Sequence, residues 1–311
     1  MSNILVAGGN GFLGSHLVDA LSSSGHYCVT VLDLYPRIYD PLPKDVTFIQ
    51  GNLDDINLIR RILEDRAIDV VYHCAWTSIH ETSNEDPVED LKANVVPTLR
   101  LLEGCRRANI KRIIFLSSGG TVYGFPKNLP IRENHPTNPI NAYGVAKLLV
   151  EKYLEMYFHL YGLEYVIFRP SVPYGPRQNP HRRQGAVSVF IYHALRGEPI
   201  TIWGTGDIVR DYFYVEDMTS ALLAALQLPF GRNAIFNLAG LKAYSLNELI
   251  HLIERTLSVR VRVSYESARR FDVPQLHLDI SAASTELRWA PTTSLSDGIQ
   301  RTAVWMRRFL K

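Results

Sequence analysis

Short apolar runs recur through the first half of the chain, and several of them are rich in β-branched residues. They predict buried strands at residues 3–7, 27–32, 46–49, 70–73, 112–116 and 165–168. Between them, apolar residues at helical spacing predict helices at residues 12–24, 54–64, 87–108 and 141–161. Strands that alternate with helices build βαβ units, so we expect an α/β fold with a Rossmann-like, doubly wound parallel sheet.

The regular alternation weakens after residue 171. Clusters of Pro, Gly and Arg continue to about residue 184, and later apolar patterns predict helices at residues 217–226 and 245–257. The chain has 311 residues, which is more than one core usually organises. We therefore expect a larger Rossmann domain at residues 1–171, to which some later segments return, and a smaller C-terminal α/β domain at residues 172–311.

Positive and negative charges nearly cancel, with 33 Lys and Arg residues against 31 Asp and Glu residues and a net charge of +2. This balance gives no electrostatic reason to expect nucleic acid or an anionic membrane as a partner. No apolar run approaches the roughly 18 residues that a membrane span needs. The N-terminus leads directly into a strand and a turn, without a basic and then apolar leader. We therefore expect a location in the cytoplasm.

The chain has three cysteines, Cys28, Cys74 and Cys105. An odd number without metal-binding spacing does not suggest a disulfide framework or a zinc site. All three lie in segments that are predicted to be strand or helix. We therefore expect buried thiols and no metal ion.

A glycine-rich turn joins the first predicted strand to the first predicted helix. Gly8 allows a tight turn, Gly11 lets the backbone approach a pyrophosphate, and Gly14 lets the helix pack closely on the sheet. Asp33 closes the second strand, about 20 residues downstream, where a carboxylate accepts hydrogen bonds from the adenosine ribose. Because this carboxylate repels a 2′-phosphate, the sequence favours NAD over NADP, although Arg37 is close enough in sequence to offset the repulsion. The alternative interpretation is a loop in which the glycines only form a turn.

Tyr143 and Lys147 lie four residues apart, on one face of the helix predicted at residues 141–161. A phenol has a pKa near 10, so it must lose about three pKa units to act as a base near neutral pH. A nearby Lys ammonium favours the phenolate, and a cationic nicotinamide ring favours it further. We therefore expect Tyr143 to move a proton with the help of Lys147. The alternative is an amphipathic interface helix that carries this common spacing by coincidence.

Motifs along nearly the whole chain match one known family. They are the turn at residues 7–14, Asp33 followed by Asn52-Leu53, His73-Cys74-Ala75-Trp76, Asn94, residues 117–124, residues 169–175, residues 210–215, and Arg269 with Asp272. In these motifs the chain resembles the extended short-chain dehydrogenase/reductase family, and within it the NAD-dependent sugar-nucleotide epimerases and dehydratases. The resemblance implies NAD as the cofactor and a nucleotide sugar, most often a UDP-sugar, as the substrate. It also implies that residues 1–171 bind NAD and that residues 172–311 mainly bind the sugar nucleotide.

The resemblance also assigns roles to individual residues. Tyr143 and Lys147 are catalytic, and a hydroxyl of Thr121 or Ser118 contacts the sugar. The implied cofactor-binding residues are Gly8, Gly11, Phe12, Leu13, Gly14, Asp33, Asn52, Leu53, Ala75, Asn94, Ser117, Tyr143 and Lys147. The implied substrate-binding residues are Thr121, Arg210, Arg269 and Asp272. The two arginines suit a diphosphate, because a guanidinium matches phosphate geometry; the alternative for each is an ordinary surface charge.

Some positions depart from the family's pattern. Gly119 stands where the family usually has a Ser or Thr whose hydroxyl bonds the reacting sugar oxygen, so Thr121, or Ser118 after a backbone adjustment, is the candidate substitute. Val172 stands where an Asn usually contacts the substrate phosphates. The other departures are Asn52 for Asp, Trp76 for Ala and Phe271 for Gly.

The residues just before Val122 bear on the reaction. Dehydratases of the family carry Asp-Glu or Glu there, and decarboxylating relatives carry Glu, whereas this chain has Gly120 and Thr121. Epimerisation at C4 needs no further acid or base, so we expect NAD-dependent epimerisation of a nucleotide sugar at C4 of a UDP-hexose. A 4-ketoreductase, another NAD-dependent sugar-nucleotide oxidoreductase and a non-catalytic NAD-binding scaffold remain open. The exact nucleotide and sugar also remain open, and we expect residues around Ser78, Thr121 and Leu276 to set the pocket size.

The helices predicted at residues 87–108 and 141–161 are apolar on more than one face. In the second of them, Leu148, Leu149, Tyr153, Leu154, Tyr157, Phe158 and Leu160 cannot all face one sheet. In the family that the chain resembles, these helices pair with their twofold copies in a four-helix bundle. We therefore expect a homodimer.

Overall fold

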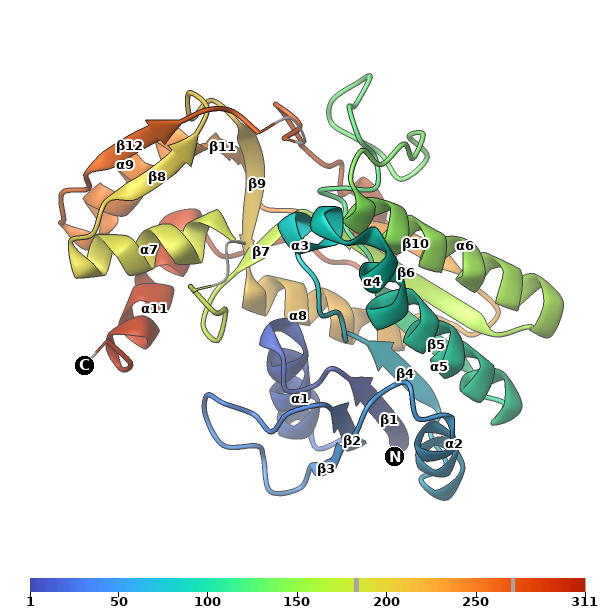
Figure 1. Cartoon of the computed structure of the whole chain (residues 1–311). Coiled ribbons are helices and arrows are strands. Elements are labelled where there is room, and N and C mark those ends of the chain that lie inside the picture. Colours follow the sequence, from blue (N-terminus) through green and yellow to red (C-terminus); the bar gives the residue numbers. More distant parts are fainter. Residues whose placement is uncertain (182–184, 270–271, 311) are drawn as a thin grey trace.

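The computed structural model describes residues 1–181, 185–269 and 272–310. Its larger part is built on a seven-stranded sheet in the order β10-β6-β5-β4-β1-β2-β3 (Figure 1). These strands are β1 (Ser2–Ala7), β2 (Tyr27–Asp33), β3 (Thr47–Gln50), β4 (Val70–His73), β5 (Arg112–Leu116), β6 (Glu164–Pro170) and β10 (Ala234–Leu238). All neighbours are parallel, and the strand order runs outward in both directions from β1. This confirms the predicted Rossmann-like, doubly wound α/β fold.

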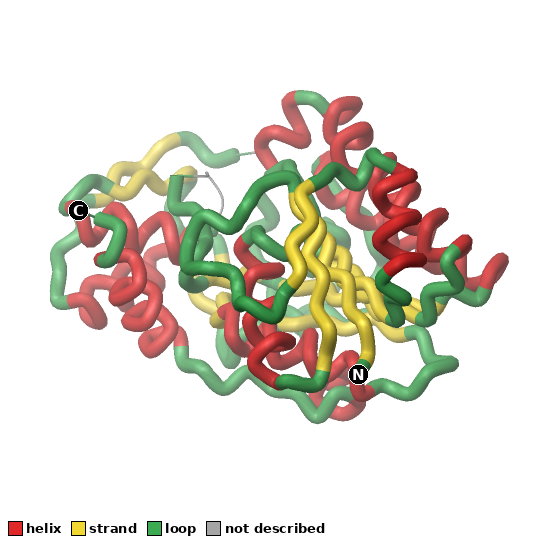
Figure 2. Tube along the Cα trace, turned by 90° about the horizontal axis from the view of Figure 1, so that it is seen from below, coloured by secondary structure: helices red, strands yellow, loops and turns green. Residues whose placement is uncertain are grey.

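Helices cover both faces of the sheet (Figures 1 and 2). One face packs against α2 (Ile56–Asp65), α5 (Val96–Arg107) and α6 (Ala142–Tyr161). The other face packs against α1 (Phe12–Ser24), α8 (Val215–Ala224) and α10 (Ser281–Glu286). Because β10, α8 and α10 come from the second half of the chain, late segments complete the sheet and its outer layer.

Capping residues in the sequence explain where several helices begin and end. Asp55 accepts hydrogen bonds from two backbone N–H groups at the start of α2, and Asn141 accepts one from Gly144 at the start of α6. Gly25 and Gly162 follow α1 and α6 in the left-handed conformation, which glycine adopts without strain. The predicted bounds of these three helices therefore lie within two residues of the observed ones.

The smaller unit is built from short strands and three longer helices. Its strands are β7 (Val172–Tyr174), β9 (Val209–Tyr214) and β11 (Ala243–Ser245) in one sheet, and β8 (Ile200–Trp203) and β12 (Val263–Glu266) in another. Its helices are α7 (Ala186–Arg196), α9 (Leu246–Leu257) and α11 (Leu295–Arg307), which share one apolar core. Figure 1 places this unit beside the carboxyl ends of the large sheet.

The helix predicted at residues 87–108 is interrupted. It consists of α4 (Pro87–Asp90), a π-helical turn at Leu91–Val95 and α5. Pro97 lacks the backbone N–H that would continue the ordinary ladder, and the N–H of Val96 instead bonds the carbonyl of Leu91, five residues back. A short helix before it, α3 (His80–Glu85), has no apolar periodicity and was not predicted.

The expectation of three buried thiols is wrong for Cys28. Cys105 is buried and Cys74 is partly buried, but Cys28 is exposed because the first two residues of β2 extend beyond the core. Among the described residues, no group of three or more His, Cys, Asp or Glu side chains is arranged to hold a metal ion. None of the described helices has the length and apolar character needed to cross a membrane.

Candidate active site

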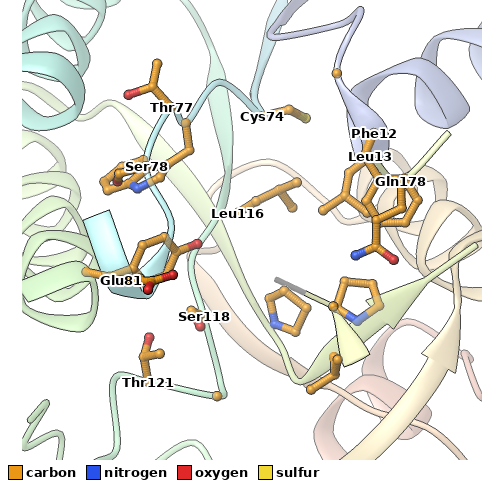
Figure 3. A pocket seen from close by; sticks show the side chains of 18 of the residues that line it. Phe12, Leu13, Cys74, Thr77, Ser78, Glu81, Leu116, Ser118, Thr121 and Gln178 are labelled. Atoms are coloured by element: carbon orange, nitrogen blue, oxygen red, sulfur yellow. The ribbon is translucent and has the colours of Figure 1, made fainter. Parts of the chain in front are cut away.

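A single large cavity of about 1520 Å³ lies at the carboxyl ends of β1, β2, β4, β5 and β6, between the sheet and the smaller unit (Figure 3). This is the edge at which open parallel sheets bind their ligands. The predicted site residues that line it are Gly8, Gly11, Phe12, Leu13, Gly14, Asp33, Asn52, Leu53, Ala75, Asn94, Ser117, Ser118, Thr121, Tyr143, Lys147, Arg210, Arg269 and Asp272. Residues as far apart in the sequence as Gly8 and Asp272 therefore line one cavity.

The glycine-rich turn requires glycine for two different reasons. Gly8 has φ +79°, and a Cβ there would lie 2.5 Å from the backbone nitrogen of Ala75. A Cβ at Gly14 would lie 2.1 Å from the carbonyl oxygen of Gly8, so only glycine lets α1 approach the turn this closely. Gly11 is the N-cap of α1 and lines the cavity. The turn therefore presents the N-terminus of α1, which favours anions, to the cavity.

Asp33 lies at the end of β2, beside this turn. Its carboxylate accepts hydrogen bonds from the backbone N–H of Asn10 at 2.9 Å and of Tyr35 at 3.3 Å. Arg37, which the sequence places nearby, turns away from the cavity and forms an ion pair with Asp19 at 2.6 Å. The described residues therefore show no ion pair between Arg37 and Asp33, so Arg37 does not neutralise the Asp33 carboxylate directly.

Tyr143 and Lys147 lie in the first two turns of α6 and both face the cavity. The Lys147 ammonium donates a hydrogen bond to the carbonyl oxygen of Leu116, at the end of β5, at 2.7 Å. Burial lowers the pKa of Lys147 to about 7. Burial, together with the carboxylate of Asp90, raises the pKa of Tyr143 well above its ordinary value. The protein groups alone therefore do not give the lowered phenol pKa that the Tyr-Lys spacing predicts, because desolvation outweighs the ammonium.

The chain after β5 places two hydroxyls toward the cavity. Ser118 and Thr121 both line it, and Figure 3 shows them on one segment, with Glu81 across from them. The Thr121 hydroxyl is buried and has no hydrogen-bond partner among the described residues. The Ser117 hydroxyl instead donates to the buried carboxylate of Glu151 on α6.

Position 119 does not face the cavity. A Cβ at Gly119 would lie 2.7 Å from the carbonyl oxygen of Arg169 on β6 and 2.5 Å from the side chain of Leu278. A Ser or Thr at this position would point into that contact, so packing against β6 requires the glycine. In this backbone, Ser118 and Thr121 line the cavity, and position 119 does not.

Asn94 lies in the π-helical turn, and its amide holds the loop that follows β4. Its oxygen accepts hydrogen bonds from the backbone N–H of Thr77 at 2.8 Å and from the Thr77 hydroxyl at 3.1 Å. Its nitrogen donates to the Asp90 carboxylate at 2.9 Å and to the Ser78 hydroxyl at 3.1 Å. All the hydrogen-bonding groups of the amide are thus engaged with protein, which fixes one wall of the cavity.

Two arginines line the end of the cavity that belongs to the smaller unit. Arg210, on β9, donates to the carbonyl oxygens of Val209 and Val273, both at 2.7 Å. Arg269 pairs with both carboxylate oxygens of Asp272, at 2.9 and 3.1 Å, and its guanidinium lies 4.7 Å from the centre of the Trp203 ring. Asp272 therefore orients an arginine. Phe271, where the family motif has Gly, lies outside the described residues.

Several cavity residues were not predicted. They include Glu81 from α3, Gln178 from the loop after β7, and Trp203 from β8. The alternation of apolar and other residues at positions 200–203 was the signal for β8 that could have located Trp203. Leu276, expected to affect pocket size, is absent from the described lining and packs in a small core cluster with Val122 and Tyr123.

Comparison with known proteins gives consistent matches over the whole chain. The sequence model of the NAD dependent epimerase/dehydratase family matches residues 4–239. A putative UDP-glucose 4-epimerase of Methanocaldococcus jannaschii is 38% identical over 304 residues, which are 98% of each chain. UDP-glucose 4-epimerase of Mycolicibacterium smegmatis is 34% identical and covers 97% of this chain and 98% of its own.

Solved structures of similar proteins also match this fold over nearly the whole chain. UDP-glucose 4-epimerase of Thermotoga maritima with UDP-glucose has a TM-score of 0.94 and 35% identity, over 99% of this chain and 100% of its own. UDP-glucose 4-epimerase of Thermus thermophilus in complex with NAD has a TM-score of 0.91 and 32% identity, over 98% of this chain and 99% of its own.

Proposed function

The chain belongs to the NAD-dependent epimerase/dehydratase family, and on this basis we propose that it is an NAD-dependent 4-epimerase of a UDP-hexose. The choice among reactions rests on the segment that follows β5. There, Gly120 and Thr121 line the cavity at the positions where dehydratases of the family carry carboxylates. Proton transfer by Tyr143 beside Lys147 is the chemistry that epimerisation at C4 requires.

The cavity residues fit NAD. The N-terminus of α1 and the close turn at Gly8 and Gly14 suit the pyrophosphate, and Asp33 suits the adenosine ribose. Asn52 and Leu53 line the same cavity and suit a contact with the adenine. When bound, NAD supplies the acceptor and then the donor of the hydride. We propose that residues 1–171 hold NAD and that residues 172–311 mainly hold the sugar nucleotide.

In the proposed reaction, the Tyr143 phenol oxygen takes the proton from the sugar 4-hydroxyl as C4 is oxidised to a ketone. The 4-keto sugar then turns over in the cavity, and Tyr143 returns the proton to the oxygen as the other face of C4 is reduced. Because burial raises the pKa of Tyr143, the positive charges of Lys147 and of the oxidised nicotinamide must both favour the phenolate. Arg210 and Arg269 suit the substrate diphosphate, and Thr121 or Ser118 bonds the sugar oxygen. Location in the cytoplasm stays a prediction.

The function is tested by incubating the purified protein with UDP-, dTDP- and GDP-sugars and resolving the products by NMR. We expect interconversion of C4 epimers of a UDP-hexose without added NAD. Stoichiometric consumption of reduced cofactor with a single reduced product would instead identify a 4-ketoreductase. No turnover of any sugar in the panel by protein that retains NAD would favour a non-catalytic scaffold.

Asp33→Asn is expected to reduce the preference for NAD over NADP by about tenfold. Asn keeps an acceptor for the N–H of Asn10 but removes the charge that repels a 2′-phosphate, and a charge-assisted hydrogen bond is worth roughly 1 kcal/mol more than a neutral one. Titration of cofactor-free protein with each dinucleotide measures the ratio. Asp45→Asn, in the same loop region but outside the cavity, should leave it unchanged. An unchanged ratio in Asp33→Asn would remove Asp33 from cofactor selection.

We propose a homodimer formed by the helices at residues 87–107 and 142–161. Exposed apolar side chains gather on these helices, which lie side by side in Figure 1. They are Val88, Leu91, Val96, Val145, Leu149, Met156 and Leu160. Pairing with a twofold copy would bury this face in a four-helix bundle.

Light scattering at micromolar concentration is therefore expected to give twice the 35.2 kDa mass of one chain. Val145→Glu should shift the protein to monomer, because it places a charge within the proposed interface. Val304→Glu, an equivalent change on α11 where the side chain is similarly exposed, should leave the mass unchanged. A monomeric mass for the unaltered protein contradicts the proposal.

A further inference from the structure

Lys147 is a buried lysine for which the described residues provide no ion pair. The residue is 4% exposed, and its ammonium donates one hydrogen bond, to the carbonyl of Leu116. No ion pair of Lys147 occurs among the described residues, and Glu151, the acidic residue one turn further along α6, is paired with Arg169 at 2.6 Å. A buried ammonium with one neutral acceptor is costly, so its pKa falls unless nearby groups stabilise the charge.

Three aromatic rings surround this ammonium. Its nitrogen lies 3.6 Å from the centre of the Trp76 ring, 4.9 Å from that of Phe115 and 5.6 Å from that of Tyr143. A cation within about 6 Å of a ring face is attracted by the ring quadrupole, most strongly by tryptophan. Trp76 is therefore both the nearest and the strongest of the three partners.

The orientation of the indole is set by these ring contacts. Trp76 packs edge to face on Tyr143, with centroids 5.9 Å apart and an interplanar angle of 70°, and lies 6.3 Å from Phe115. Its N–H is buried and has no hydrogen-bond acceptor within the described part of the chain. The ring is therefore held by packing, on the apolar core and on Phe115 and Tyr143, with its face toward the Lys147 ammonium.

We propose that Trp76 is a positioning residue for the reaction, whose indole face holds the Lys147 ammonium in its charged form beside Tyr143. This inference rests on the proposed function of the same site. Alanine at this position, as the family pattern usually has, offers no such face. The indole adds a stabilising contact to the ammonium beside its hydrogen bond to the Leu116 carbonyl.

The titratable groups around Lys147 do not by themselves keep its ammonium fully charged, so the Trp76 ring can add to its stabilisation. Burial keeps His73 and Cys74 neutral, because it lowers the pKa of His73 to about 3 and raises that of Cys74 to about 12. Asp90 from α4 and Glu151 from α6 are the carboxylates that favour the ammonium. Even with both present, burial brings the pKa of Lys147 down to about 7. A contact that favours the ammonium therefore increases the charged fraction of Lys147 near neutral pH.

The test reduces the attraction between the Trp76 ring face and the ammonium while nearly keeping the shape of the side chain. Cofactor-free protein is prepared with lysine labelled with ¹³C at Cε, and with tryptophan, 5-fluorotryptophan or a difluorinated tryptophan. The Lys147 signal is identified by its absence from Lys147→Met. Fluorine withdraws electron density from the ring face, so the Lys147 midpoint is expected to fall stepwise with fluorination, by about one pH unit in total.

Trp76→Phe is the matched background. It keeps an aromatic ring, and the same labelling still places fluorine on Trp203, Trp289 and Trp305, so the Lys147 midpoint should not respond to fluorination there. In the unaltered sequence, the alkaline limb of the kcat profile should move to lower pH together with the NMR midpoint. A Lys147 midpoint that does not change on fluorination overturns the proposal. A midpoint that moves while the pH profile of kcat stays unchanged also overturns it.

The two readouts separate this proposal from the proposed function. The NMR titration needs neither cofactor nor turnover, so it tests the ring contact even if no UDP-hexose is epimerised. Epimerisation by the unaltered protein together with a fluorine-insensitive midpoint would overturn the role of Trp76 alone. Failure of epimerisation would overturn the reaction in which this role is proposed.

Discussion

Tyr143→Phe is expected to lower kcat by about 10²–10⁴-fold while NAD stays bound, the usual cost of removing a general base. The change deletes one oxygen atom, which is the group proposed to take the proton from the sugar 4-hydroxyl. The ring remains, so its edge-to-face contact with Trp76 and its distance from the Lys147 ammonium should persist. Turnover is measured by NMR with the accepted UDP-hexose, and bound NAD by extraction from the purified protein.

Tyr153→Phe provides the matched control. Tyr153 lies on the same helix as Tyr143, packs on the core and is not part of the described cavity lining. Its loss of a hydroxyl should leave both kcat and NAD content near those of the unaltered protein. A Tyr143→Phe protein that keeps more than a tenth of the original kcat would exclude Tyr143 as the base, whereas loss of NAD would show that the hydroxyl also holds the cofactor.

The first half of the fold could be predicted because its local signals agree with its tertiary contacts. Strands such as β4 and β5 are buried along their whole length and consist mainly of apolar residues. Asp55 and Asn141 cap the starts of α2 and α6, and glycines follow the ends of α1 and α6. The glycine-rich turn and Asp33 followed from the same pattern, whereas most other site residues came from the resemblance to the family. Once the sheet is parallel, residues that come just after each strand must meet at its carboxyl edge.

The features that the sequence could not predict depend on burial and on tertiary packing. The Tyr143-Lys147 spacing predicts a lowered phenol pKa, but the spacing contains no information on desolvation, which dominates both groups here. The short strands of the smaller unit, such as β7 and β11, have three residues each, too few for a period to be recognised. The π-helical turn follows the missing N–H of Pro97, and Asn94 within it bonds the loop after β4; the apolar pattern of this segment indicates neither feature.

Gly119 illustrates the same limit at a single position. The sequence shows only that a hydroxyl is missing from a place where the family usually has one. The backbone shows that a side chain at 119 would meet the carbonyl of Arg169, while Ser118 and Thr121 line the cavity. The question is therefore which of these two hydroxyls bonds the sugar oxygen as it develops carbonyl character.

We expect it to be Thr121, and Thr121→Val should lower kcat by about 10–100-fold, which corresponds to losing one hydrogen bond of roughly 1.5–3 kcal/mol to a partly charged oxygen. Valine keeps the shape of the side chain. Because the Thr121 hydroxyl is buried without a partner among the described residues, its removal should not lower the melting temperature, and relief of a buried unpaired group should raise it slightly. A loss of rate at unchanged or higher stability separates a sugar contact from a structural role.

Two further variants complete this prediction. Thr121→Ser keeps the hydroxyl and should retain nearly full kcat, which shows that the oxygen and not the methyl group matters. Ser118→Ala removes the competing hydroxyl, which also lines the cavity and belongs to the same segment in Figure 3. If Thr121→Val turns over normally while Ser118→Ala does not, Ser118 bonds the sugar and Thr121 only fills the strand end. A loss of kcat in both Thr121→Val and Ser118→Ala would mean that both hydroxyls bond the sugar oxygen. Such sharing is possible because the two residues flank position 119, which has no side chain.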